Sequence, residues 1–193
     1  RNTTGLTSLH LGRRFIGFHI DDYAYKESKR VIEEHVETTP DRWKLYLEDG
    51  CEMNSLKDKS EYVDCVFTSP PYTGQPEPYN QDPRDLCNMS FDDFYKRIDV
   101  MMRNVARLIK KSDHENKRYH PIIFVVGTHR NGKEGIFDMD VEFQNIARSH
   151  GLTLWDKQFL ETNNPHLVCS LQRNFEFKFV HKNYETSLVF VKF

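Results

Sequence analysis

The sequence has 193 residues, of which 38% are hydrophobic and 29% are charged, values that are ordinary for a soluble globular protein. A chain of this length fits one domain, and it contains no apolar run close to the roughly 20 residues that a membrane-spanning helix needs. The formal net charge is −2, with 27 basic and 29 acidic side chains. This balance argues against nucleic-acid binding that is driven by the overall charge of the protein.

Cysteine and histidine usage predicts a reduced protein of the cytoplasm without a metal site. No two cysteines form a CxxC pair, and the nine histidines show no spacing typical of metal ligands. The first fifteen residues also lack the apolar segment of a signal peptide. The four cysteines are Cys51, Cys65, Cys87 and Cys169.

The first half of the chain predicts three strands and one helix. RRFIGFHI (13–20) is rich in β-branched and aromatic residues, which favours a strand, and a helix follows from Asp21 or Asp22 to about residue 36. WKLYLED (43–49) and YVDCVFT (62–68) predict two more strands. Because 62–68 is almost continuously apolar, we expect a strand that is buried on both faces of a parallel sheet.

The middle of the chain predicts a long loop and then the clearest helix. Residues 73–90 show no periodicity, and loops of this length inside compact domains are usually functional or mobile. Ser90 begins a capping box, S-F-D-D, and the apolar residues through Ile109 recur at three- and four-residue spacing. We expect this apolar stripe to pack in the core, and we expect residues 110–120 to form a solvated polar linker.

The last third predicts a strand, a helix and three further strands. PIIFVVG (121–127) is a buried strand, and the helix 141–151 ends at Gly151. The remaining strands are expected at 152–160, 175–181 and 185–193, with the last two joined as an antiparallel hairpin. Alternating strands and helices followed by a hairpin predict a doubly wound α/β domain with a mixed sheet.

A short motif, Ser69-Pro70-Pro71-Tyr72, lies where the strand 62–68 ends. In open α/β sheets ligands bind beyond the carboxyl ends of the strands. A double proline cannot continue a central strand, so it leaves the Ser69 hydroxyl, the Pro70 carbonyl and the Tyr72 ring on a stiff turn. Two acceptors beside an aromatic face suit a flat heterocycle that carries an amino group. The alternative is a proline-rich turn without chemistry.

TSPPY (68–72) resembles the catalytic motif of the DNA amino-methyltransferases, which transfer a methyl group from S-adenosylmethionine to an exocyclic base nitrogen. The serine form is most similar to the N4-cytosine branch, whereas the N6-adenine branch more often has aspartate at the position of Ser69. Four further segments resemble the family in the same order along the chain. These are RRFIGFHIDDYAYKESKRV, LYLEDGCEMNSL, FVVGTHRNG and NYETSLVFVKF. The resemblance implies a Rossmann-like methyltransferase fold.

The resemblance also implies roles for individual residues. Ser69, Pro70, Pro71 and Tyr72 take the catalytic positions. S-adenosylmethionine is the implied cofactor, and Asp49 stands where the family meets its adenine. The family has an acidic residue for the ribose at the position of His19, so Asp21 either substitutes for it or caps the following helix. The implied cofactor-binding residues are Thr3, Thr4, His19, Asp21, Asp49 and Thr68.

The chain departs from the family at its start. The glycine-rich cofactor loop and the first strand before it are not recognisable, and only Thr3 and Thr4 match the end of that loop. Three explanations remain open: a fragment of a longer polypeptide, a subunit completed by a second chain, or a degenerate domain that no longer binds cofactor. No segment from Tyr72 to Phe193 is large enough for a target-recognition domain, so we expect sequence readout to come from elsewhere.

These observations together predict methyl transfer to the N4 amine of cytosine in DNA, with the base flipped out and stacked on Tyr72. The reaction requires no metal and no cysteine nucleophile. Arg130, Lys133 and Arg173 are candidates for contacts to phosphate or to the flipped base, or are ordinary surface charges. Two alternatives stay open: N6-adenine methylation, and a non-catalytic subunit that uses the same fold to bind nucleic acid or a partner protein.

Overall fold

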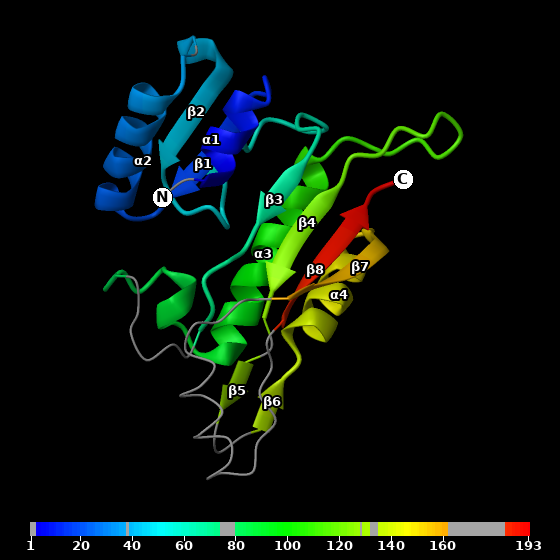
Figure 1. Ribbon diagram of the computed structural model, residues 1–193. Helices are drawn as coiled ribbons and strands as arrows, with labels where there is room; N and C mark the ends of the chain where they lie inside the picture. The colour runs from blue at the N-terminus through cyan, green and yellow to red at the C-terminus, as the bar shows by residue number, and fades with distance from the viewer. Residues whose placement is uncertain (1–2, 38, 74–79, 128, 132–134, 162–183) are drawn as a thin grey trace. The chain divides into compact units, whose positions relative to one another are not determined.

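The computed structural model describes residues 3–37, 39–73, 80–127, 129–131, 135–161 and 184–193. Figure 1 labels the helices and strands of the chain, which divides into two compact units. Unit 1 consists of residues 1–63 and 71–110, and unit 2 consists of residues 64–70 and 111–193.

Unit 1 contains a parallel pair of strands, β1 (Phe15–His19) and β2 (Trp43–Leu47), which run in register from Phe15 opposite Trp43 to His19 opposite Leu47. Helices α1 (Thr3–His10) and α2 (Asp22–His35) contact β1, and α2 also contacts β2. These elements agree with the predicted strands and with the predicted helix after Asp21. Gly17 permits the close pairing, because a Cβ there would lie 2.9 Å from side-chain atoms of Leu45 and Phe15.

The rest of unit 1 is dominated by helix α3 (Phe91–Leu108), which three short 3₁₀ helices precede in the chain: η1 (Pro40–Arg42), η2 (Asn54–Leu56) and η3 (Leu86–Asn88). Ser90 caps α3, since its hydroxyl oxygen accepts a hydrogen bond from the backbone N–H of Asp93 at 3.2 Å. The predicted apolar stripe is confirmed as core. Phe91 at its start is only half-buried. The buried members of the stripe are Phe94, Ile98, Met101, Val105, Leu108 and Ile109.

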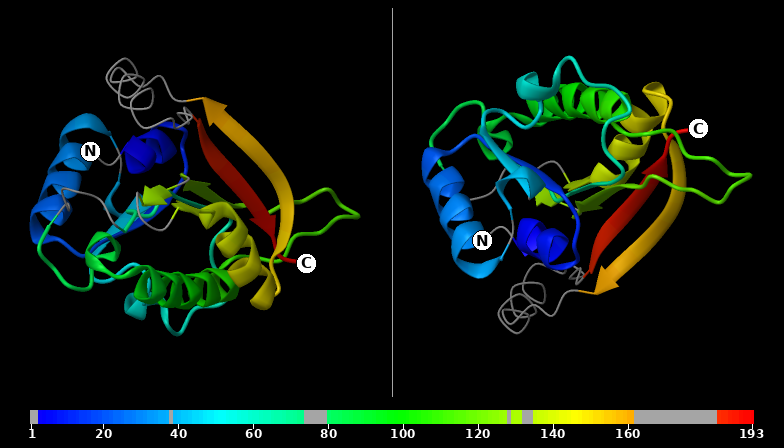
Figure 2. Two further views of the ribbon diagram at one scale, coloured as in Figure 1. Left: turned by 90° about the horizontal axis from the view of Figure 1, so that it is seen from below. Right: turned by 90° about the horizontal axis from the view of Figure 1, so that it is seen from above.

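Unit 2 contains a four-stranded mixed sheet in the order β3–β4–β8–β7. β3 and β4 are parallel, whereas β8 is antiparallel to both β4 and β7, so the last strand of the chain lies inside the sheet. Figure 2 shows β7 and β8 side by side as a long curved pair. The strands are β3 (Val66–Thr68), β4 (Ile122–Val126), β7 (Thr153–Glu161) and β8 (Tyr184–Val191).

Helix α4 (Met139–Ser149) contacts β7 and β8 and completes the core of unit 2. Phe124 of β4 packs edge-to-face against Phe143 of α4, with ring centroids 5.5 Å apart, and against Phe190 of β8 at 6.4 Å. All three rings are almost completely buried. Gly151 follows α4 with a φ of +74°, as the predicted helix end requires.

The strand predicted at 62–68 is shorter and more exposed than expected, so that prediction was wrong in its burial. Only Val66–Thr68 form β3, Cys65 is exposed, and the Phe67 side chain is 49% exposed. Among the described strands, β3 pairs only with β4 and therefore forms an edge of its sheet. Apolar composition alone could not distinguish an edge strand from a central one.

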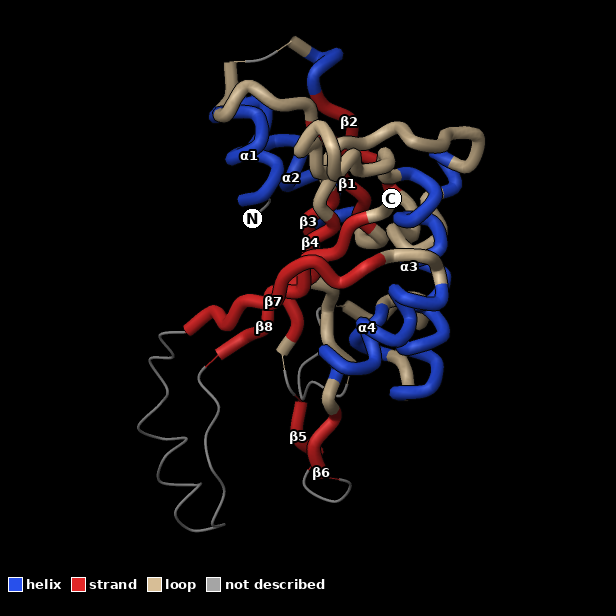
Figure 3. Tube along the Cα trace, turned by 90° about the vertical axis from the view of Figure 1, so that its right-hand side faces the viewer, coloured by secondary structure: helices blue, strands red, loops and turns tan. Residues whose placement is uncertain are grey.

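Two further segments differ from the sequence-based expectation. Residues around 129–137 form a small separate antiparallel pair, β5 (His129–Asn131) and β6 (Gly135–Phe137), where only a loop was predicted (Figure 3). The predicted strand 175–181 lies outside the described residues, so the terminal hairpin can be assessed only through β8. Within the part of the chain that the structure describes, no helix is both long enough and apolar enough to cross a membrane.

Candidate functional site

The first half of the SPPY motif follows strand β3 in unit 2. β3 ends at Thr68, which is half-buried and pairs in register with Phe124 of β4. Ser69 is exposed and Pro70 is buried. Because β3 and β4 are parallel, their carboxyl ends lie at the same edge, and the Ser69 hydroxyl is presented beyond that edge rather than packed in the core.

The second half of the motif belongs to unit 1. Pro71 and Tyr72 are half-buried, and Thr73 is buried. The Thr73 hydroxyl donates a hydrogen bond to the main-chain carbonyl of Met89. The chain that leaves the motif is therefore tied to the segment that leads into α3.

The described end of the long loop is held by its own side chains. The buried Asp85 carboxylate accepts hydrogen bonds from the Asn80 amide at 2.6 Å and from the Cys87 N–H at 3.0 Å. The Asn88 amide donates to the main-chain carbonyls of Asn80 and Asp82 at 3.0 and 2.8 Å. Residues 80–89 thus form a structured support for the chain beside the motif.

His19 and Asp49 lie at the carboxyl ends of the parallel strands β1 and β2, which meet at the same edge of this pair. His19 is the last residue of β1, lies opposite Leu47, and is half-buried, while Asp49 comes two residues after β2 ends. Burial lowers the pKa of His19, and the charge of Asp21 opposes this only in part. The imidazole is therefore neutral near pH 7, and it can both donate and accept hydrogen bonds.

Asp21 is a helix cap. Its Oδ1 accepts a hydrogen bond from the Ala24 N–H at 2.7 Å, at the start of α2. Of the two roles left open by the sequence, the structure displays this one.

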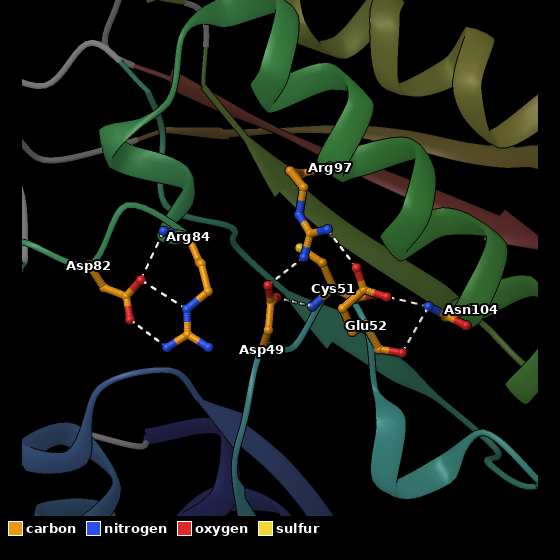
Figure 4. Close-up of polar contacts among 7 residues, drawn as sticks. All are labelled: Asp49, Cys51, Glu52, Asp82, Arg84, Arg97 and Asn104. Carbon is orange, nitrogen blue, oxygen red and sulfur yellow. Dashed lines mark hydrogen bonds and ion pairs between the residues drawn. The ribbon is translucent and has the colours of Figure 1, made fainter.

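Residues 49–53, here called the acidic turn, wrap around the Asp49 side chain (Figure 4). Asp49 Oδ1 accepts from the Cys51 N–H at 2.8 Å, and the Asp49 carbonyl accepts from the N–H groups of Glu52 and Met53 at 3.1 Å each. Met53 closes the turn with a left-handed φ of +50°. Asp49 Oδ2 forms an ion pair with Arg97, whose second terminal nitrogen donates to Glu52 Oε1 at 2.6 Å.

One polar face of α3 holds the acidic turn and the residues after it. Asn104 Nδ2 donates to the carbonyls of Cys51 and Glu52 at 2.8 and 3.1 Å. Arg107 donates to the carbonyls of Leu56 and Lys59, and also to the Asn104 side-chain oxygen at 3.2 Å. We call these three residues, Arg97, Asn104 and Arg107, the α3 clamp.

Sequence reasoning missed the α3 clamp because it treated α3 only as a source of core residues. A signal was present: Arg97, Asn104 and Arg107 follow one another at spacings of seven and three residues, which places them on one helix face beside the apolar stripe. Their partners, however, lie some fifty positions earlier in the chain, and helical periodicity cannot identify them.

The electrostatics of this region depend on burial and ion pairing. Burial opposes the charge of Arg97, but the hydrogen bond to Glu52 and the charge of Asp49 outweigh it and raise its pKa. Burial, followed by the charge of Asp49, raises the pKa of the Cys51 thiol to about 12. Cys51 is therefore protonated at neutral pH and is not a nucleophile. The pKa of Arg84 is raised chiefly by its hydrogen bond to Asp82, with which it pairs at 2.7 Å, and the charge of Asp49 adds a smaller part.

The remaining predicted site residues are less fully defined. Thr3 and Thr4 lie exposed in the first turn of α1. Arg130 belongs to β5, while Lys133 and Arg173 lie outside the described residues. The described residues contain no group of three or more histidine, cysteine, aspartate or glutamate side chains that could hold a metal ion.

The comparisons with known proteins find that this chain is similar in fold to several solved structures. No protein-family model matches the sequence, and no curated protein is significantly similar to it. Among solved structures, a candidate DNA modification methylase from Thermus thermophilus is 16% identical with a TM-score of 0.51, over 93% of this chain and 53% of that one. The same methylase complexed with S-adenosyl-L-methionine is 17% identical, with a TM-score of 0.51, over 75% and 51%. This chain thus spans about half the length of that protein.

Two other solved structures match over more of their length. A SAM-dependent methyltransferase from Methanosarcina mazei is 11% identical with a TM-score of 0.56, over 96% of this chain and 86% of that one. The [4+2]-cyclase SpnF is 12% identical with a TM-score of 0.58, over 98% and 71%. These likenesses, at such low identity, establish the fold alone: the chain has the Rossmann-like α/β fold of methyltransferases, as the sequence predicted.

Proposed function

We propose that this chain is the catalytic domain of an S-adenosylmethionine-dependent DNA methyltransferase that modifies the N4 amine of cytosine in a flipped-out base. One observation carries the proposal: the SPPY motif directly follows β3, beside the parallel strand β4, and its serine is exposed. The likeness of fold to methyltransferases, including a candidate DNA modification methylase, supports it. The proposed domain covers residues 1–193, with neither the glycine-rich loop nor target recognition assigned within it.

In this proposal the SPPY motif positions the reacting amine. The Ser69 hydroxyl oxygen and the Pro70 carbonyl accept hydrogen bonds from its two N–H groups, while the Tyr72 ring stacks on the base. The lone pair of an exocyclic amine is delocalised into the ring, which makes it a poor nucleophile. Acceptors outside the ring plane draw the nitrogen toward tetrahedral geometry, and a fixed orientation supplies much of the rate.

The residues after β1 and β2 fit the nucleoside part of S-adenosylmethionine. A neutral His19 can hydrogen bond to ribose hydroxyls, and the Asp49 carboxylate keeps lone pairs that can accept the adenine amine. We assign Thr3, Thr4 and Thr68 to the same ligand. When bound, the cofactor supplies an electrophilic methyl group. No protein nucleophile is required, in keeping with the high pKa of Cys51.

On the DNA side, a base inside a duplex cannot reach the motif, so the target must rotate out of the stack. Arg130, Lys133 and Arg173 are proposed to contact phosphates or the flipped base. Recognition of the surrounding sequence is assigned to another segment or a partner chain.

Two alternatives make different predictions. N6-adenine methylation uses the same acceptors, because both bases carry an exocyclic amine. A non-catalytic role is favoured by one observation: His19 stands where the DNA amino-methyltransferases have an acidic residue. The fold by itself does not imply methyl transfer, since the [4+2]-cyclase SpnF has a similar fold.

The decisive experiment measures transfer of a labelled methyl group to DNA, followed by nucleoside analysis. We expect N4-methylcytosine, and we expect Ser69→Ala to slow transfer by about ten- to a hundredfold because one acceptor of the amine is lost. Ser60→Ala, an exposed serine in the loop before β3, is the control and should leave the rate unchanged. N6-methyladenine as the sole product would replace the cytosine assignment. Absence of transfer together with absence of cofactor binding would favour the non-catalytic role.

A further inference from the structure

We infer that Arg97 is a positioning residue for the cofactor base: it fixes the Asp49 carboxylate as an acceptor and thereby sets a preference for adenine over hypoxanthine. The inference rests on the proposed function, since it takes Asp49 as the residue that meets the base. It concerns a residue of α3 that has no place in the SPPY motif or in the segments that resemble the methyltransferase family.

Arg97 is held between two carboxylates of the acidic turn (Figure 4). One terminal nitrogen pairs with Asp49 Oδ2 and the other with Glu52 Oε1, the latter at 2.6 Å. Side-chain exposure is only 24% for Arg97 and 14% for Asp49, so water screens this pair less than it screens the surface pairs on α2. The planar guanidinium reaches both partners at once, which a lysine ammonium could not do with the same geometry.

Two contacts of Asp49 fix the plane of its carboxylate. Oδ1 accepts from the Cys51 N–H and Oδ2 accepts from Arg97. The Cys51 thiol also hydrogen bonds to this carboxylate. An ionised carboxylate offers about four lone-pair positions, so at least one remains for a ligand after these three contacts. The carboxylate can only accept hydrogen bonds. It therefore favours the 6-amino group of adenine and opposes the 6-oxo group of hypoxanthine, which would place two acceptors face to face.

The α3 clamp separates this role from simple support of the turn. Asn104 and Arg107 bind main-chain carbonyls of residues 51–59, whereas Arg97 binds the carboxylates. Loss of Arg97 therefore leaves the backbone of the turn held by the other two residues and releases mainly the Asp49 side chain. Arg107 is the matched control, since it belongs to the same helix and anchors the neighbouring backbone without touching Asp49.

The test is calorimetric binding of S-adenosylhomocysteine and of its hypoxanthine counterpart, S-inosylhomocysteine, to the chain. We expect the wild type to prefer the adenine ligand. Arg97→Met should weaken binding of the adenine ligand about tenfold and remove most of the preference for adenine. A loss of this size corresponds to one charge-assisted hydrogen bond, here the bond between the ligand and the Asp49 carboxylate that Arg97 no longer fixes. Arg97→Lys should retain part of the preference. Arg107→Met should lower the melting temperature but keep the ratio of the two affinities.

Two results would overturn the inference. If the wild type prefers adenine and Arg97→Met keeps the same ratio, Arg97 is only a structural residue. If the wild type binds neither ligand, the proposed function falls and the inference falls with it. Circular dichroism checks folding of each variant. Should Arg97→Met fail to fold, Arg97→Lys decides, and an unchanged ratio there also overturns the inference.

A double variant adds an independent check. Asp49→Asn replaces an acceptor-only group by an amide that can also donate, so we expect the preference to shift toward the hypoxanthine ligand. In the Asp49→Asn background, Arg97→Met should cause little additional change, because its proposed target has been removed. An additional tenfold loss in that background would contradict the inference.

Discussion

His19 affects stability through its burial, beside the role in ligand binding proposed for it. It ends β1 half-buried, and burial lowers its pKa from the ordinary value of 6.5, with Asp21 opposing the shift in part. The unfolded chain therefore binds a proton at a pH where the folded chain does not. The free energy of unfolding should fall as the pH drops through 6.5, and it should stop falling on this account only below the pKa of folded His19.

We predict that wild-type protein loses more stability between pH 7.5 and pH 5.5 than His19→Gln does. Urea unfolding followed by circular dichroism measures the difference, and comparison of the two proteins cancels the titration of the carboxylates. His35→Gln is the control, because it removes an exposed histidine at the end of α2 and should leave the loss as large as in the wild type. Equal losses in wild type and His19→Gln would show that burial of His19 has no thermodynamic consequence.

Residue positions were predictable where the local sequence defines the environment. Asp49 was expected as the last residue of the strand 43–49 and lies two residues after β2 ends, while Asp21 was expected to be either a helix cap or a ribose ligand and is found as a cap. Arg97 was not predicted, because its importance comes from carboxylates distant in sequence. Local pattern identifies groups near a strand end, but it does not identify the long-range partner that orients them.

At the scale of elements, α3 carries two different surfaces. One face supplies a large share of the buried apolar residues of unit 1, and the adjoining face carries the α3 clamp that holds the acidic turn. The start of this helix depends on Ser90, whose hydroxyl accepts from the Asp93 N–H and donates to the Asp93 carboxylate at 2.8 Å. A cap of this kind satisfies a backbone donor that the helix cannot satisfy itself.

We predict that Ser90→Ala lowers the free energy of unfolding by about 1 kcal/mol, whereas Ser90→Thr retains most of it. Urea denaturation monitored at the helical circular dichroism band provides the measurement. Ser149→Ala, at the exposed end of α4, serves as the control and should change stability by only a few tenths of a kcal/mol. An effect of Ser90→Ala no larger than that of the control would contradict the capping role.

Helices α2, α3 and α4 and strands β1, β2, β4 and β7 were predicted from sequence because local patterns define them: caps, periodic apolar positions and β-branched runs. The pattern misjudged β3, since an apolar run does not reveal that β4 is its sole neighbour among the described strands. It also missed β5 and β6, whose three-residue strands are too short for a period to be recognised. Which strands pair with one another depends on tertiary contacts, so amino-acid composition alone does not predict it.

At the scale of the whole molecule, charge bears on the proposed binding of DNA. The net charge is −2, and several basic side chains are paired with acidic neighbours. The described pairs include Lys26–Asp22, Arg30–Glu27, Arg84–Asp82, Lys96–Asp93 and Lys157–Asp140. With a net charge of −2, binding of DNA by the proposed enzyme should depend more on the flipped base than on phosphate contacts.

We therefore predict a shallow salt dependence and a strong effect of base pairing. DNA affinity of the chain should fall less than about a hundredfold between 50 and 200 mM salt, whereas six to ten phosphate contacts would cost about 10³ to 10⁵. A cytosine opposite a mismatched base should bind more tightly than a paired one, because less energy is needed to extrude it. Fluorescence anisotropy with matched duplexes measures both quantities, and a duplex whose mismatch contains no cytosine is the control. A steep salt dependence with equal affinity for paired and mismatched cytosine would mean that the chain holds the DNA backbone and not a base at Tyr72.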